Sequence, residues 1–191
     1  MIKKLLQIWI LFIGSALITA QGASLSIDPL LQSVDAGELV FVDIVVSDLE
    51  PDIISAYDLS ISFDNTIVNF STINIDDAAF GFSISDFEST TAPGIISFNL
   101  ASFELDADLD ILQNDSFTLA TLGFETLNNG GTSTLSFSHV DIVGANSSNI
   151  TPSLGSASVR VNTITSVSEP SVLLLLGIGV FGIFSRKKPA V

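Results

Sequence analysis

Apolar and polar residues alternate with a period of two through most of residues 25–161, and a helical period is hard to find. This alternation is typical of β-strands, because successive side chains point to opposite faces of a sheet. The two clearest examples place the following residues on one face: Val40, Val42, Ile44 and Val46 in the segment 39–47, and Tyr57, Leu59, Ile61 and Phe63 in the segment 54–63. We expect both sets to point into a hydrophobic core.

Residues that favour turns divide the chain into about nine segments of this kind. The expected strands are 25–27, 39–47, 54–63, 67–70, 79–87, 95–101, 117–125, 135–143 and 156–161. Strands of this length and spacing are typical of β-sandwiches, and the helical crossovers that a parallel sheet needs are not visible. The pattern therefore predicts an all-β protein, an antiparallel, jelly-roll-like β-sandwich of about nine strands over residues 24–162.

Three stretches of this sandwich carry specific expectations. Residues 128–131, Asn-Asn-Gly-Gly, are the strongest hairpin signal in the chain, since Asn and Gly tolerate the positive φ of tight turns. We expect Leu135 and Phe137 to pair with residues of the strand on the other side of this turn. Residues 102–115 are acidic, and we expect a loop there. The expected strand 79–87 would place these residues on one face: Phe80, Phe82 and Ile84.

The N-terminus departs from the alternation. It begins with two Lys residues near the start, continues with an almost wholly apolar run over residues 5–18, and then contains small residues. A basic start, an apolar centre and a small-residue end are typical of a secretory signal peptide. We expect residues 1–23 to be a signal peptide that signal peptidase cleaves near residues 20–23. An N-terminal membrane anchor is the alternative.

The C-terminus is also different. An unbroken run of apolar residues and Gly extends from Val172 to Phe184. This run has no polar face, so it does not suit the surface of a soluble domain. It is followed by three basic residues, Arg186, Lys187 and Lys188, which fit the cytoplasmic side of a membrane. We therefore expect a transmembrane helix over residues 171–185, reached through a polar spacer at residues 163–168; a buried terminal hairpin is the alternative.

Ser168, Glu169 and Pro170 stand directly before this run. A short Pro-containing motif, an apolar helix and an Arg/Lys cluster at the extreme C-terminus resemble the PEP-CTERM sorting signal of Gram-negative bacteria that make exopolysaccharide. Glu169 and Pro170 match that motif, and Ser168 stands where its first Pro would be. The resemblance implies that residues 169–191 are a sorting tail and that the membrane protease exosortase recognises Glu169 and Pro170.

Charge separates the ends of the chain from its middle. Arg160 is the only Lys or Arg between the two terminal segments, whereas every acidic residue except Glu169 lies between Asp28 and Asp141. The middle therefore carries 20 acidic residues against one Arg. A surface of this sign repels nucleic acid, so we expect no nucleic-acid partner. The chain has no Cys, which excludes disulfides and thiol chemistry.

A second resemblance spans most of residues 25–161. The segments LVFVDIVVSD, ISAYDLSISFDNTIVNF and DSFTLATLGFETLNNGGTSTLSF, in this order, are similar to cohesin-like and bacterial carbohydrate-binding sandwiches. The matching positions are Ala56, Asp58, Leu59, Ile61, Phe63 and Asp64, followed by Leu119 to Phe124. The resemblance implies a ligand-binding sheet face, with a dockerin-like protein or a polysaccharide as ligand, and no motif selects between them. We expect Asp58 and Asp64 to be surface and turn residues.

Few residues suggest further chemistry. Asp106, Asp108 and Asp110 are spaced like the first half of a calcium loop, so they are a candidate Ca2+ site, with a solvated acidic loop as the preferred interpretation. Ile111 and Phe117 occupy the positions where an EF-hand needs Gly and Glu, which excludes an EF-hand. No other cofactor is expected.

An enzyme is not expected either. His139 is the only His, and it continues the face of Leu135 and Phe137, so we expect it to pack at the sheet edge rather than act as a general base. Motifs for a nucleophile, zinc or phosphate are not found. Trp9, the only Trp, lies in the expected signal peptide, and Tyr57, the only Tyr, is expected to face the core, which leaves little for stacking on sugars.

These features together predict an exported, non-catalytic bacterial surface or extracellular-matrix protein whose sandwich binds a protein or a polysaccharide. It would cross the inner membrane, stay anchored by its C-terminal helix until exosortase acts, and then reach the cell surface or matrix. The alternative is a carbohydrate-binding module that acts on exopolysaccharide. A polysaccharide hydrolase, which needs only two suitably placed carboxylates, is a more remote alternative.

Overall fold

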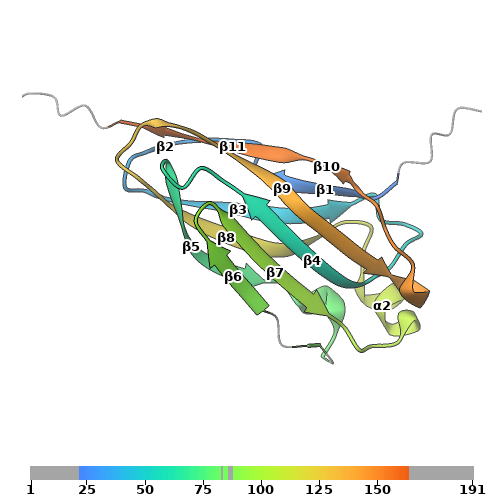
Figure 1. Cartoon of the computed structure of the whole chain (residues 1–191). Coiled ribbons are helices and arrows are strands. Elements are labelled where there is room, and N and C mark those ends of the chain that lie inside the picture. The colour runs from blue at the N-terminus through green and yellow to red at the C-terminus, as the bar shows by residue number, and fades with distance from the viewer. Residues whose placement is uncertain (1–21, 83, 86–87, 164–191) are drawn as a thin grey trace, which may run out of the picture.

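The computed structural model describes residues 22–82, 84–85 and 88–163, which fold into two packed β-sheets (Figure 1). Across the five-stranded sheet the order is β10 (Ser153–Leu154), β1 (Ser24–Asp28), β3 (Leu39–Ser47), β8 (Phe117–Thr126) and β5 (Val68–Ile75). Across the six-stranded sheet it is β2 (Leu31–Asp35), β11 (Ser156–Asn162), β9 (Gly131–Gly144), β4 (Ile54–Ser62), β7 (Ile95–Ala101) and β6 (Glu88–Ala92). The predicted β-sandwich is confirmed.

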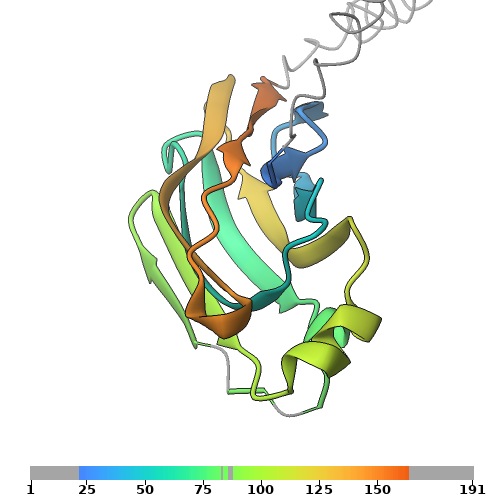
Figure 2. The same cartoon turned by 90° about the vertical axis from the view of Figure 1, so that its right-hand side faces the viewer.

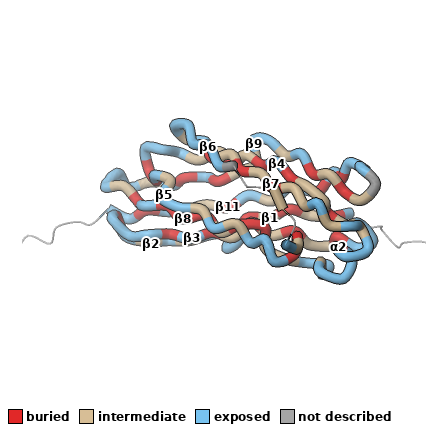
Figure 3. The backbone as a smooth tube through the Cα atoms, turned by 90° about the horizontal axis from the view of Figure 1, so that it is seen from below, coloured by how far each residue is buried: buried red, intermediate tan, exposed pale blue. Residues whose placement is uncertain are grey.

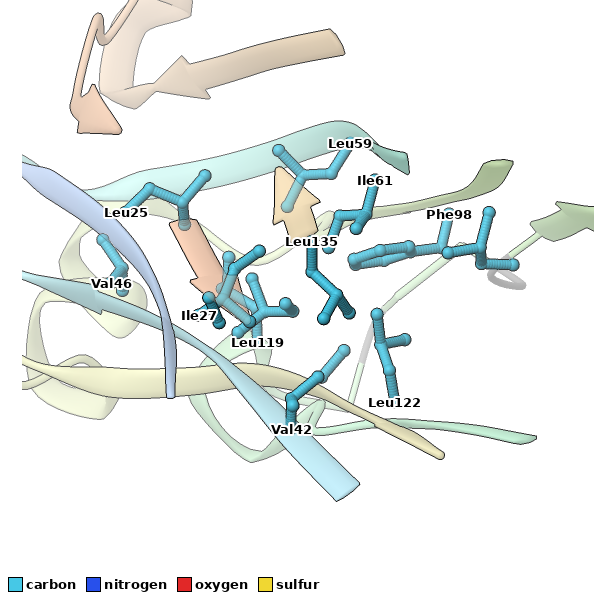
Figure 4. Packing of buried hydrophobic residues seen from close by; sticks show 14 of the residues in the cluster. Leu25, Ile27, Val42, Val46, Leu59, Ile61, Phe98, Leu119, Leu122 and Leu135 are labelled. Atoms are coloured by element: carbon cyan, nitrogen blue, oxygen red, sulfur yellow. The ribbon is translucent and has the colours of Figure 1, made fainter. Parts of the chain in front are cut away.

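The core forms where the inward faces of the two sheets meet, as the alternation of buried and exposed residues along the strands shows (Figure 3). Val42 and Leu122 of one sheet point toward Leu59, Ile61 and Phe98 of the other (Figure 4). All of these side chains are fully or almost fully buried. Burying each one stabilises the fold by about 1.5–3 kcal/mol relative to leaving it in water.

Most neighbouring strands are antiparallel, but two pairs at one side of the sandwich are parallel. β1 pairs with β10, and β2 pairs with β11. The chain switches sheets twice here, between β1 and β2 at Pro29 and Leu30, and between β10 and β11 at Gly155. The amide of Gly155 donates to the carbonyl of Leu25 at 2.8 Å. The segment β1–β2 and the segment β10–β11 therefore each contribute one strand to each sheet, and they connect the two sheets along this side.

The expected hairpin at residues 128–131 is wrong, because β8 and β9 belong to different sheets. Both sides of β8 are already occupied, by β3 and β5, so β9 has no free edge of β8 to pair with. Leu135 pairs with Ala157 and Phe137 pairs with Ile61. The Asn-Asn-Gly-Gly turn instead carries the chain from one sheet to the other.

The region between β5 and β8 also differs from expectation. A short 3-10 helix, η1 (Ala78–Phe80), replaces the start of the expected strand 79–87, and Gly81 adopts a positive φ of 79°. Phe80 is therefore buried while Phe82 is fully exposed, and the two do not share a face. The expected loop at 102–115 contains the helix α2 (Asp106–Leu112), which buries Leu109.

The predicted transmembrane helix at residues 171–185 and nearly all of the predicted signal peptide lie outside the described residues. Within the part of the chain that the structure describes, no helix is long and apolar enough to cross a membrane. The chain leaves β11 at the end of the sandwich that lies opposite α2 (Figure 1).

Candidate binding faces

The outer face of β9, β4 and β7 is covered by short hydroxyl side chains, and we call it the hydroxyl face. The hydroxyls of Ser60 and Ser97 lie 2.8 Å apart, and those of Ser62 and Ser136 lie 3.0 Å apart. Each pair joins neighbouring strands across the sheet. No described element lies over this face in either view (Figures 1 and 2). Short side chains leave it flat and open to a partner.

One row across the hydroxyl face carries two carboxylates and an amide. Asp58 on β4 is opposite Asp141 on β9 and opposite Asn99 on β7. Both aspartates are exposed. Like charges directly opposite one another destabilise a sheet. This row therefore costs the free chain stability and suits a cationic group from a partner. Asp58 was expected only to be a surface residue, and its register with Asp141 was not visible in the sequence.

His139 lies at the border of the hydroxyl face. A β-bulge shifts the register between β4 and β9, so that Ser60 is opposite His139 while Ile61 is opposite Phe137. The expectation that His139 continues the Leu135 and Phe137 face is therefore wrong, because the extra residue turns the imidazole outward, and it is exposed. A hollow of about 310 Å³ lies beside it, lined in part by Ser138, Val140 and Thr151.

The candidate calcium residues lie on α2. Successive helical residues are about 100° apart, so Asp108 points away from the side shared by Asp106 and Asp110. Among residues 22–82, 84–85 and 88–163, no group of three or more His, Asp or Glu side chains could hold a metal ion. The structure thus does not bring these three carboxylates together around one point.

Tyr57 lies in the core, as predicted from its place on the inward face of β4. Its hydroxyl donates to the carbonyl oxygen of Leu119 at 3.4 Å, and its ring packs edge-on against Phe80 at 5.6 Å between centroids. Burial raises the pKa of the Tyr57 phenol well above its ordinary value, and the negative charges of Asp76 and Asp77 raise it further. The ring is not available to a ligand at the surface.

The outer face of the five-stranded sheet has one aromatic side chain that the sequence reasoning missed. Phe41 on β3 is opposite Gly123 on β8 and is half exposed. A Cβ atom on Gly123 would lie 2.9 Å from Cε1 of Phe41 and 2.6 Å from Cγ2 of Thr72, so the ring lies directly against the glycine. The sequence feature that could have revealed Phe41 is a Phe at an outward position of a strand whose valines point inward.

Polar groups lie in the next row beside this ring. Thr121 donates a hydrogen bond of 2.6 Å to the Asp43 carboxylate, and Asn74 is opposite Thr121 on the neighbouring strand. An apolar ring next to hydrogen-bonding side chains is an arrangement that can hold a sugar. The same ring also shields the backbone of Gly123, which is a structural role that needs no ligand.

The predicted sorting residues Glu169 and Pro170 and the basic residues Arg186, Lys187 and Lys188 lie outside the described residues. Comparison with known proteins identifies this part of the chain instead. Residues 166–188 match the PEP-CTERM protein-sorting motif. No curated protein matches the chain.

Solved structures match the sandwich itself. A cohesin from Clostridium acetobutylicum has a TM-score of 0.60 at 20% identity, over 76% of this chain and 94% of that one. A type I cohesin–dockerin complex from Clostridium thermocellum gives 0.60 at 15% identity, over 74% and 100%. A non-cellulosomal cohesin from the archaeon Archaeoglobus fulgidus gives 0.58 at 10% identity, over 75% and 94%.

Similarity at these identities establishes the fold, and it confirms the cohesin-like sandwich expected from the sequence. The match at residues 166–188 confirms the expected sorting signal despite Ser168 in its first position. The chain therefore joins a sandwich of the cohesin fold to a C-terminal PEP-CTERM sorting motif, which indicates an exported, surface-sorted protein.

Proposed function

We propose that the sandwich is a non-catalytic binding module and that its hydroxyl face binds a partner protein at the cell surface. The row formed by Asp141, Asp58 and Asn99 is the observation that carries this proposal. Its carboxylates repel each other in the free chain, and a Lys or Arg from a partner would relieve that repulsion through charge-assisted hydrogen bonds. The fold supports the proposal, since one of the similar structures is a cohesin–dockerin complex.

The hydroxyl face suits protein binding for a second reason. Serine side chains lose little rotamer entropy on binding, and each hydroxyl can donate or accept a hydrogen bond. The pairs Ser60 with Ser97 and Ser62 with Ser136 are already aligned across the strands. A partner can therefore meet a flat surface whose polar groups need little rearrangement.

The termini complete the proposal. Signal peptidase would release the sandwich from residues 1–23, and the C-terminal helix at residues 171–185 would anchor it until exosortase acts near Glu169 and Pro170. The basic residues Arg186 to Lys188 would hold the tail in the cytoplasm until then. Deletion of residues 169–191 followed by cell fractionation tests this sorting route. Unchanged retention at the surface would contradict it.

The binding proposal is tested by reversing charge on the hydroxyl face. Asp58→Lys and Asp141→Lys should each weaken binding of a partner recovered from the cell surface by roughly tenfold or more. Asp28→Lys is the matched control, because Asp28 is an exposed aspartate on β1 of the other sheet. Equal binding by all three variants would show that the hydroxyl face is not the interface.

Polysaccharide binding is a second candidate function, favoured by Phe41 lying against Gly123 beside Asp43 and Thr121. Sugar rings stack on aromatic faces, so Phe41→Leu should abolish binding to the host's purified exopolysaccharide while Phe41→Tyr keeps it. Isothermal titration or a gel-shift measurement with the polysaccharide gives the result. Binding that survives Phe41→Leu would assign the ring its structural role alone.

A further inference from the structure

Four large apolar side chains are exposed in or directly beside η1 and α2, which lie at one end of the sandwich. Phe103 is 72% exposed, Leu105 is 73% and Ile111 is 82%, and Phe82 is fully exposed. We call these four residues the apolar end. Single exposed apolar residues are ordinary on protein surfaces, whereas a group of them marks a site of interaction.

Hydrogen bonds hold the backbone of the apolar end together. The Ser102 hydroxyl donates to the carbonyl of Phe80 at 2.6 Å, and the amide of Phe82 donates to a carboxylate oxygen of Glu104 at 3.2 Å. Residues 80–82 therefore lie beside residues 102–104, and α2 follows directly. Gln113 at the end of α2 donates to the carbonyl of Ala79 at 3.2 Å, which fixes the helix against η1. These hydrogen bonds therefore fix the backbone that carries the exposed side chains.

The surroundings of the apolar end are acidic. The nearby carboxylates are those of Glu50, Asp52, Asp106, Asp108 and Asp110, and we call them the acidic rim. Arg160, the only Lys or Arg among the described residues, is opposite Thr132 at the start of β9, whereas α2 lies near Ile54, which is opposite Gly144 at the end of β9. About 40 Å of strand separates the two positions. Arg160 therefore lies too far away to neutralise the acidic rim.

We infer that the apolar end binds an amphipathic, Lys- or Arg-rich segment of a second protein. Its apolar face would cover Phe103, Leu105 and Ile111, and its cations would meet the acidic rim. A second copy of this chain would bring the same negative charge against it, and anionic lipid headgroups would be repelled in the same way. α2, which carries Ile111, lies at the end of the sandwich opposite the point where the chain leaves β11 (Figure 1).

The apolar end and the hydroxyl face share no residue and are tested with different variants, so the inference and the proposed function can fail independently. The test places a photo-crosslinking amino acid at Ile111 in the full chain, in its own cells, with the same group at Leu31 on β2 as control. Leu31, like Ile111, is a well exposed apolar residue, and it lies on another part of the sandwich. The expected result is a crosslink from position 111 alone, to a protein segment that mass spectrometry shows to be amphipathic and rich in Lys or Arg.

The crosslinked segment is then synthesised and titrated against the full chain. Ile111→Ser and Phe103→Ser should each weaken binding roughly tenfold without changing the melting temperature, and Leu31→Ser should leave binding unchanged. Added NaCl should weaken binding by the wild type, because the rim contributes through charge. A crosslink to lipid, to a second copy, to the chain's own termini or to a segment without cations would overturn the inference, as would the absence of any crosslink.

Discussion

The side chain of Gln113 pairs with the main chain of Ile54 as a neighbouring strand would. Its Oε1 accepts from the Ile54 amide at 2.8 Å, and its Nε2 donates to the Ile54 carbonyl at 2.6 Å. Ile54 is fully buried and begins β4, so water does not readily replace these bonds. One polar side chain thus fastens α2 to the sandwich and satisfies the first backbone groups of a central strand.

Gln113→Ala should therefore be strongly destabilising. It leaves two buried backbone groups of Ile54 without partners, and each unpaired group costs about 1–3 kcal/mol. We expect the free energy of unfolding to fall by roughly 2–6 kcal/mol in urea titrations. Gln32→Ala is the control, because Gln32 also donates to a carbonyl, that of Phe41 at 2.6 Å, but at an exposed site. Equal losses in both variants would contradict the argument from burial.

The buried phenol of Tyr57 predicts a loss of stability at high pH. Its pKa is raised in the folded state, so the contribution is complete below the ordinary value of about 10 and falls as pH rises above it. We expect the free energy of unfolding to fall above pH 10 in the wild type and to fall less in Tyr57→Phe. Tyr57 is the only Tyr, so tyrosinate absorbance reports this residue alone. Its appearance near pH 10 without unfolding would contradict the prediction.

Asp64 predicts an effect at low pH. Its Oδ1 accepts from the Thr66 hydroxyl at 2.6 Å and from the Thr66 amide at 2.9 Å, and these bonds lower the pKa of the carboxyl. The stabilisation is present above the ordinary pKa and is lost as pH falls through the lowered one. Thr66→Val should raise the pKa of Asp64 in an NMR titration. Thr151→Val, at an exposed Thr beside Pro152 and away from Asp64, should leave that pKa unchanged.

Gly37 and Gly94 allow the cost of a left-handed backbone conformation to be measured apart from the cost of a steric contact. Gly94 has φ of 77°, and a Cβ there would lie 2.9 Å from the carbonyl oxygen of Phe63; Gly37 has φ of 88° and open space around it. The left-handed conformation costs a residue with a Cβ about 1–2 kcal/mol. Gly37→Ala should show that loss in urea unfolding, and Gly94→Ala should show a larger one. Equal losses would mean that the turn relaxes away from Phe63.

The strands that local pattern predicts best are those with strong alternation and clear turn residues at both ends. The bounds of β3 and β7 agree with those expected at residues 39–47 and 95–101. The edge strands β2, β6 and β10 were missed, because each is short and offers few inward apolar residues. The inward position of Tyr57 was likewise predictable, since alternation alone places it.

The errors arise where distant parts of the chain decide the outcome. The partner of β9 depends on β8 being already paired on both sides, which no local signal at residues 128–131 reveals. The outward position of His139 depends on a bulge where β9 pairs with β4. The formation of α2 depends on a buried site that accepts Leu109. The row of Asp58, Asp141 and Asn99 comes from three separate strands, so only the register brings it together.

The strand that leads to the sorting tail, β11, has a mechanical consequence for a protein held at a surface. β11 is bonded to β2 on one side, in parallel, and to β9 on the other. A pull at its C-terminal end acts along the strand, so the bonds on both sides resist together in shear instead of opening one after another. A load between a bound partner and the tether would therefore be shared by the hydrogen bonds on both sides of β11.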